Sequence, residues 1–130
     1  MSATETSFEE RLAQKGVLVA DGATGTNYQS MGMEPGLAPE EWLFVAPDRV
    51  VELHRAFADA GADILLTCTF GATPLRLTEG PLAGRAREVN LRAAELATEQ
   101  VIDVDGEQWM IADVRASEHG QAQLICIYPE

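Results

Sequence analysis

The sequence has few cysteines, few basic residues and no long apolar run. Its two cysteines, Cys68 and Cys126, lie far apart and have neither a CxxC nor a Cys/His spacing, which indicates neither a disulfide framework nor a metal site. Nine Lys and Arg against 21 Asp and Glu give a net charge of −12, so nucleic acid would be repelled. No run approaches the roughly 20 apolar residues of a membrane span. Residues 2–6 are polar and acidic, unlike a signal peptide, so we expect a protein of the reducing cytoplasm.

What is present is the composition of a folded domain. The chain has 130 residues, of which 46% are hydrophobic and 23% charged. These values are ordinary for globular proteins and unlike those of disordered chains. The length suits one domain of modest size.

The apolar spacing predicts helices and strands in alternation. A Ser-x-x-Glu capping box, a proline at a helix start and glycines at helix ends support the assignment. We predict helices over residues 7–15, 47–60 and 81–99, and buried strands over residues 17–20, 62–69 and 109–112. This order indicates βαβ crossovers and a parallel sheet with helices outside. Gly, Pro, Asn and Ser occur throughout residues 22–46, which predicts a long loop. A loop of this length is usually functional.

The first strand ends in Asp21-Gly22-Ala23-Thr24-Gly25-Thr26. A carboxylate at a strand end can accept hydrogen bonds from a ligand ammonium, and Gly22 lets ligand and backbone approach closely. The alternative is that Asp21 caps the turn and the glycines permit positive φ. The motif is neither GxGxxG nor a P-loop, so phosphate binding has little support.

The second strand ends in Thr67-Cys68-Thr69-Phe70-Gly71, which repeats this pattern. Strand alternation places Thr67 and Thr69 on one face and Cys68 on the other. The hydroxyls could orient a polar substrate, although Thr is also a common strand residue. Cys68 has no neighbouring His or Lys, so we expect a small buried apolar group rather than a reactive thiol.

Other conspicuous residues have structural interpretations. His54 lies on the apolar stripe of the second predicted helix, so we expect a packed histidine. Trp42 lies in the long loop, and we expect it to anchor that loop rather than cover a site. The acidic pair Glu40 and Glu41 is interpreted as solvated charge.

Taken together, these segments resemble the homocysteine S-methyltransferase family, which includes the homocysteine-binding module of methionine synthase and the betaine–homocysteine methyltransferases. The matching stretches are residues 21–26, 47–64, 67–72 and 89–90. The similarity runs from about residue 8 to residue 112, and residues 113–130 form a divergent tail. On this basis residues 1–130 are a partial homocysteine-binding domain. The match is specific for the family and not for a methyl donor.

The resemblance implies a (β/α)₈ TIM barrel with homocysteine at the carboxyl ends of the strands. Asp21 would contact its amino group, Gly22 and Ala23 would line the same pocket, and Thr69 would form part of the wall. The resemblance also implies a zinc ion, held by three cysteines of later strands, that binds the substrate sulfur. A metal-bound thiol is deprotonated at neutral pH, which gives the thiolate that accepts the methyl group and becomes methionine.

The chain departs from the family in several respects. Cys68 replaces the usual Asn, and Cys126 lacks the flanks of a zinc cysteine, so the zinc ligands are absent from this sequence. A full barrel takes about 250 residues. We therefore expect the first three βα units of a truncated barrel, inactive as an isolated chain.

Two other functions are considered. In one, the chain is a non-catalytic assembly fragment that associates with itself or another chain through open sheet edges, with apolar residues 124–128 as a fourth strand. In the other, it is a small flavodoxin-like domain that binds a ligand at the turns of Asp21 and Thr69.

Overall fold

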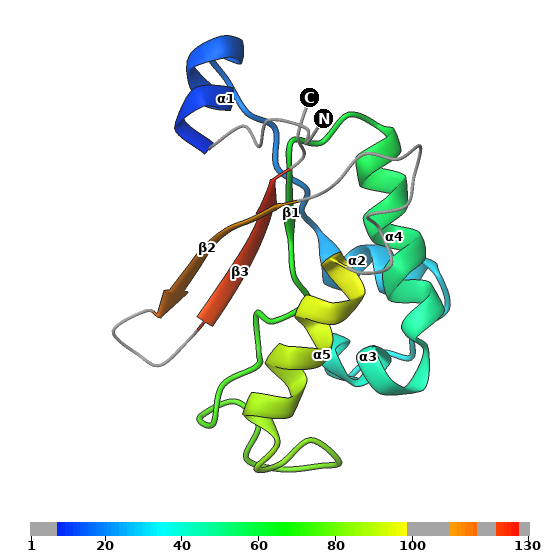
Figure 1. Ribbon diagram of the computed structural model, residues 1–130. Helices are drawn as coiled ribbons and strands as arrows, with labels where there is room; N and C mark the ends of the chain where they lie inside the picture. Colours follow the sequence, from blue (N-terminus) through cyan, green and yellow to red (C-terminus); the bar gives the residue numbers. More distant parts are fainter. Residues whose placement is uncertain (1–7, 99–109, 117–121, 128–130) are drawn as a thin grey trace.

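The computed structural model describes residues 8–98, 110–116 and 122–127 of the chain. The helices are α1 (Phe8–Lys15), α2 (Thr24–Ser30), α3 (Trp42–Val45), α4 (Pro47–Asp59) and α5 (Ala86–Thr98), with a 3₁₀ turn η1 (Pro39–Glu41). The strands are β1 (Ile64–Leu66), β2 (Met110–Ala116) and β3 (Ala122–Ile127). Figure 1 shows α2, α3 and α4 on one side of β1, the pair β2 and β3 on the other, and α5 below β1. No helix in the described ranges is long and apolar enough to cross a membrane.

The three strands form one antiparallel sheet in the order β1-β3-β2. Strand β3 pairs with β1 from Ile64↔Ile127 to Leu66↔Ile125, and β2 pairs along the other edge of β3. The prediction that the strand near residues 109–112 joins a parallel sheet is therefore wrong. Strands β2 and β3 follow one another closely in sequence, and short connections favour antiparallel pairing. The predicted fourth strand in the tail is confirmed as β3, and it lies between β1 and β2.

The first predicted strand, residues 17–20, is parallel to β1 but makes only one bridge, from Ala20 to Ile64. Backbone hydrogen bonds from the amides of Asp63 and Ile64 to the Val19 carbonyl, 2.7 and 3.1 Å long, continue this contact. The expectation of a buried strand is wrong, because Val17 and Val19 are 71% and 57% exposed. Among the described residues, this segment is paired only along its edge toward β1.

The predicted loop over residues 22–46 contains three short helical segments, α2, η1 and α3. Each buries a large side chain or a charged one, and the rings of Tyr28 and Trp42 pack with centroids 5.0 Å apart. Such short helices are stabilised by tertiary packing rather than by their own propensity. The role of Trp42 as an anchor is confirmed, since its side chain is buried in the core.

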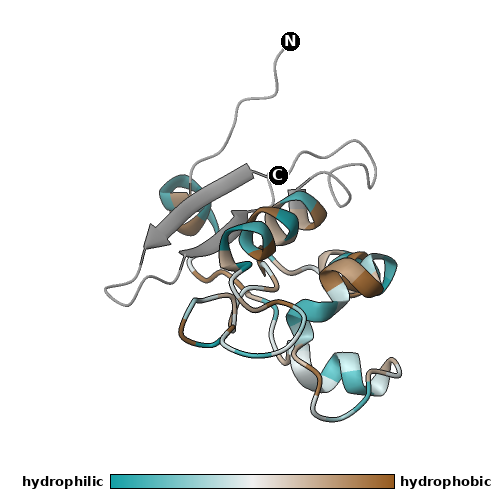
Figure 2. Ribbon diagram, turned by 90° about the horizontal axis from the view of Figure 1, so that it is seen from below, coloured by the Kyte–Doolittle hydropathy of each residue, from teal (hydrophilic) through white to brown (hydrophobic). Residues whose placement is uncertain are grey.

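The core lies between the helices and the segment that follows β1. Helix α4 contributes Val50 and Leu53, and α5 contributes Val89, Ala93 and Leu96. Figure 2 shows the result on the ribbons, whose helices are brown on one face and teal on the other. These stripes confirm the predicted apolar faces. His54 is also buried on α4, as expected.

A glycine follows the end of α4, as the sequence analysis predicts. After α4, Gly61 has φ +100°, and the amides of Gly61 and Ala62 donate to the carbonyls of Ala58 and Phe57. This is a Schellman motif, which favours glycine at the left-handed position. Helix α5 begins later than the predicted residue 81, after Gly84, whose φ is +73°. Ser7 and Trp109, which we placed at the ends of predicted elements, lie outside the described residues.

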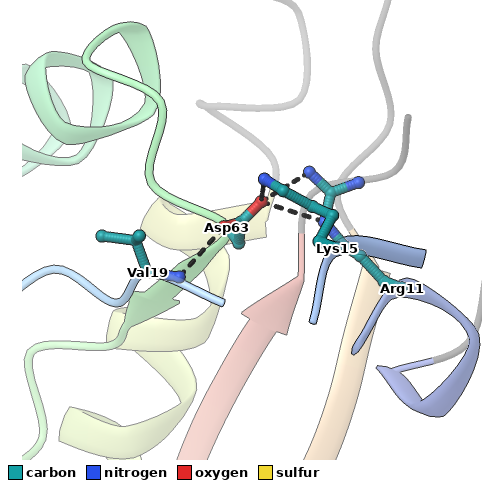
Figure 3. A network of polar contacts seen from close by, with 4 residues as sticks. All are labelled: Arg11, Lys15, Val19 and Asp63. Carbon is teal, nitrogen blue, oxygen red and sulfur yellow. Dashed lines mark hydrogen bonds and ion pairs between the residues drawn. The ribbon is translucent and has the colours of Figure 1, made fainter. Parts of the chain in front are cut away.

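A buried carboxylate joins α1 to the start of β1 (Figure 3). Asp63 Oδ1 accepts hydrogen bonds from Arg11 Nη2 at 2.7 Å and Nε at 3.2 Å, and from Lys15 Nζ. Its Oδ2 accepts from the Val19 amide at 3.0 Å. Burial opposes ionisation of Asp63, but the hydrogen bonds from Lys15, Val19 and Arg11 outweigh it and lower its pKa to about 2. Asp63 therefore carries a charge that holds three segments together.

Candidate functional site

A cavity of about 600 Å³ opens where β1 ends and α2 begins. Four stretches of chain line it, namely residues 22–25, 38–40, 66–71 and 76–77. The first and third stretches are the two strand-end motifs of the sequence. The structure therefore brings both motifs to one hollow, together with part of the long connection.

The first motif forms a turn that leads into α2. Ala23 has φ +54°, a left-handed conformation that residues with a side chain seldom adopt. Its carbonyl accepts from Asn27 Nδ2 at 2.9 Å and from Thr26 Oγ1 at 3.0 Å, which holds the turn. A Cβ at Gly22 would meet nothing within 4 Å. Gly22 and Ala23 thus present backbone, and little side chain, to the cavity.

Asp21 does not itself line the cavity. Its Oδ1 accepts a hydrogen bond from the Leu66 amide at 3.0 Å, so the carboxylate holds the ends of two adjacent segments together. Burial raises the pKa of Asp21, and the hydrogen bonds from the amide groups of Leu66 and of Asp21 itself act in the opposite direction. Of the four residues predicted to bind substrate, Gly22, Ala23 and Thr69 meet at the cavity, and Asp21 lies directly behind it.

The second motif places a pair of hydroxyls and a thiol in the wall. A hydrogen bond of 3.0 Å joins the Oγ1 atoms of Thr67 and Thr69, as the predicted shared face requires. Cys68 is 4% exposed, and burial, with a contribution from the charge of Glu40, raises the pKa of its thiol to about 12. The Tyr28 hydroxyl hydrogen-bonds to Cys68 and opposes this effect. Cys68 is therefore a neutral thiol at physiological pH, and the expectation of a buried, unreactive cysteine is confirmed.

Glu40 is the residue of this site that the sequence analysis missed. The interpretation of Glu40 as solvated charge is wrong, since only 3% of the residue is exposed. Its Oε1 accepts a hydrogen bond from the Gly71 amide at 2.6 Å, and a Cβ on Gly71 would lie 3.0 Å from that oxygen. No local pattern in the sequence indicates this burial, because the contact is with the amide of a residue 31 positions further along the chain.

The opposite charge in the cavity wall belongs to Arg76. Its guanidinium lies over the ring of Phe70, with Cζ 5.4 Å from the ring centroid. Both side chains line the cavity and are exposed to solvent. The site therefore combines a buried carboxylate, an accessible guanidinium and apolar surface from Phe70 and Leu77.

The described residues do not fit a zinc site. Within residues 8–98 and the two later strands, no three His, Cys, Asp or Glu side chains lie close enough together to hold a metal ion.

Comparison with known proteins assigns the chain to a protein family. The sequence model of the family described as homocysteine S-methyltransferase matches residues 18–118, which include every residue lining the cavity. The chain belongs to the homocysteine S-methyltransferase family. The resemblance of the strand-end motifs is thereby confirmed.

Curated relatives agree with this assignment. The chain is 32% identical over 99 residues to "Methionine synthase" of Mycobacterium leprae (strain TN), a match that covers 72% of this chain and 8% of the relative. It is 36% and 35% identical over 91 residues to "S-methylmethionine--homocysteine S-methyltransferase BHMT2" of Mus musculus and Rattus norvegicus. Each of these two matches covers 69% of this chain and 24% of the relative. The chain thus spans a quarter or less of the length of these relatives.

Proposed function

We propose that the cavity at the end of β1 binds homocysteine, and that the chain forms part of an enzyme that methylates homocysteine to methionine. One observation carries the proposal. Gly22, Ala23 and Thr69, which come from two motifs far apart in sequence, line a single cavity in a chain of this family. The carboxyl ends of parallel strands are where α/β proteins bind small molecules.

The chemistry of the wall suits an amino acid with an apolar side chain. Glu40 and Arg76 bring one negative and one positive charge to the cavity, and homocysteine carries an ammonium and a carboxylate. Leu66, Phe70 and Leu77 supply apolar surface for the methylene groups and the sulfur. A cavity of about 600 Å³ is within the range that small-molecule sites occupy.

Asp21 remains part of the proposed site. Burial disfavours its charged form, so a ligand ammonium close to it would stabilise the carboxylate and would itself be bound more tightly. Asp21 directly precedes Gly22, whose open side allows a ligand to approach the backbone. We propose that Asp21 contacts the amino group and that Thr69 forms part of the wall.

We also propose that residues 17–66 are the first βα unit and second strand of a (β/α)₈ barrel. The parallel bridge between Ala20 and Ile64, with helix α4 in the connection, supports this. A flavodoxin-like domain is less favoured, because the turn at Asp21 has neither a GxGxxG nor a P-loop sequence. The assembly fragment is the second candidate, because residues 17–20 are paired, among the described residues, only along their edge toward β1.

The methyl donor is a further part of the proposal. A methyl group on positively charged sulfur transfers readily to a thiolate, because the leaving group departs as a neutral thioether. S-methylmethionine, which appears in the names of the mouse and rat relatives, is such a compound. We include it as a candidate methyl donor for the enzyme to which this chain contributes.

The proposed function is tested by calorimetric titration of the chain with homocysteine under reducing conditions. We expect the wild-type chain to bind, and Gly22→Leu, which extends a side chain into the cavity, to bind at least about tenfold more weakly. Ala83→Leu, at an exposed position outside the cavity, is the control and should bind like wild type. A wild-type chain that does not bind homocysteine, or a Gly22→Leu variant that binds equally well, contradicts the proposal.

A further inference from the structure

The carboxylate of Glu40 is buried in the cavity wall and has no cationic partner among the described residues. Other carboxylates of residues 8–98, such as Asp63 and Glu88, form ion pairs with arginine. Glu40 has instead the neutral Gly71 amide on Oε1, at 2.6 Å. A buried carboxylate that lacks a positive partner lowers stability, because it loses hydration that one neutral donor does not replace. A binding site can tolerate that cost if the ligand supplies the missing charge.

The position of Glu40 is fixed from two sides. The Gly71 amide orients its carboxylate toward the loop after β1, and the absence of a Cβ on Gly71 leaves the space that Oε1 occupies. The turn that carries it is closed by Glu41, whose Oε2 accepts from the Ala38 amide at 3.1 Å. A side chain held by packing and hydrogen bonds loses little further freedom when a ligand binds. Glu40 therefore resembles a prepared binding group more than a surface charge.

The negative charge of Glu40 also acts across the cavity wall. It is one of the causes, after burial, that raise the pKa of the Cys68 thiol, and it contributes in the same way at the Tyr28 hydroxyl. Arg76 lies in the same wall but over Phe70, and it forms no ion pair with Glu40. The region around Glu40 consequently favours a positive group.

We propose that Glu40 is the anionic recognition group of the cavity and directly contacts a positively charged group of the bound ligand. The inference rests on the proposed function and deepens it. In methyl transfer to homocysteine, the cation has two possible sources: the α-ammonium of homocysteine and the sulfonium of a methyl donor. Both are monovalent organic cations that a carboxylate can bind by charge-assisted contact.

The test compares ligands that differ in charge, in wild type and in Glu40→Gln. The glutamine keeps the shape and an oxygen that can accept from the Gly71 amide, and it removes the charge. The first pair of ligands is homocysteine and 4-sulfanylbutanoate, which lacks the amino group. The second is S-methylmethionine and methionine, which lacks the sulfonium. Glu34→Gln, the same substitution at an exposed position outside the cavity wall, is the matched control.

We expect wild type and Glu34→Gln to prefer the charged member of at least one pair by about tenfold or more, as a charge-assisted contact requires. Glu40→Gln should reduce that preference below about threefold. The pair in which the preference disappears identifies the source of the cation. If Glu40→Gln does not fold, Gly71→Ala should weaken the same preference, because its Cβ would lie 3.0 Å from Oε1 and the carboxylate would have to shift.

The outcomes separate the two proposals. Glu40→Gln, or Gly71→Ala in its place, that keeps every preference of wild type overturns the role of Glu40 and leaves homocysteine binding intact. A wild-type chain that binds none of the four ligands overturns the proposed function itself.

Discussion

Replacement of Asp63 by asparagine tests whether the buried ion pair network fixes α1 to β1. Asp63 is 1% exposed and Arg11 is 4% exposed, so this interaction takes place away from solvent. Asparagine has the same shape, and it can still accept a hydrogen bond from the Val19 amide. It cannot neutralise Arg11 and Lys15, so the variant isolates the contribution of the charge.

The lowered pKa of Asp63 gives the size of the stability loss expected for Asp63→Asn. A decrease from 3.8 to about 2 corresponds to about 2 kcal/mol of stability for the charged form. The Lys15 side chain is 36% exposed, so solvent screens part of its share. Breaking a buried ion pair by removing one partner costs about 3–5 kcal/mol in measured cases. We expect Asp63→Asn to lose about 2–4 kcal/mol at neutral pH.

The sign of the pH dependence follows from the direction of the shift. The folded pKa of Asp63 lies below the unfolded value, so the contribution is complete above about pH 5. It declines as the pH falls through 3.8 and is lost near pH 2. The difference in stability between wild type and Asp63→Asn should therefore shrink from about pH 4 downward. If the substitution only disturbed packing, the difference in the free energy of unfolding between wild type and the variant would be the same at every pH.

The assay is urea unfolding followed by circular dichroism at neutral pH and at intervals down to pH 2.5. Asp59→Asn, an exposed aspartate on α4, is the control and should change stability by less than about 0.5 kcal/mol. A loss below about 1 kcal/mol for Asp63→Asn at neutral pH would refute the reasoning. A larger loss that is unchanged from neutral pH to pH 2.5 would show that the charge is not its cause.

Three further predictions use the same urea assay. Leu43→Ala should cost about 2–5 kcal/mol, because the side chain is fully buried, and a cost below about 1 kcal/mol would contradict its place in the core. Burial lowers the pKa of His54 to about 4, so the stability of wild type should fall by about 2 kcal/mol between pH 7 and pH 5 as the unfolded state gains protons. His54→Leu should lose most of that pH dependence. If the pH dependence is unchanged in His54→Leu, the buried histidine is not its cause. Gly61→Ala should cost about 1 kcal/mol or more, because φ is +100° at the end of α4; equal stability would mean that the turn relaxes.

The parts of the fold that were predicted from sequence are those with a local signal. The apolar residues of α4 and α5 repeat at helical spacing. Gly61 predicts the end of α4, which the structure closes with a Schellman motif. The parallel contact of residues 17–20 with the strand that follows α4 was also predictable, because a helix joins them. In each case the signal lies in a local pattern: an apolar repeat, a glycine, or a helix that connects two apolar segments.

The errors arise where distant residues decide the structure. The short helices α2 and α3 have no apolar repeat long enough to identify, and they form because Tyr28, Trp42 and Leu43 are buried against other elements. The strand order was missed for a similar reason. The apolar residues 124–128 suggested a further strand, but only the pairing of β3 with both β1 and β2 determines that it lies between them.

The candidate site contains both kinds of residue: some have a local sequence signal, and others are placed by contacts with distant residues. The motifs around Gly22 and Thr69 were recognisable because a carboxylate, glycines and hydroxyls follow apolar strands, and these residues do meet at the cavity. Glu40 has no such pattern, since its burial depends on the amide of Gly71, 31 residues further along the chain. A charged residue in a long loop is by default interpreted as solvated, and only a contact across the fold reverses this. Gly71 and Glu40 are therefore best interpreted as a pair. Gly71 leaves the space that Glu40 occupies, and Glu40 places in the cavity a charge that a ligand cation can neutralise.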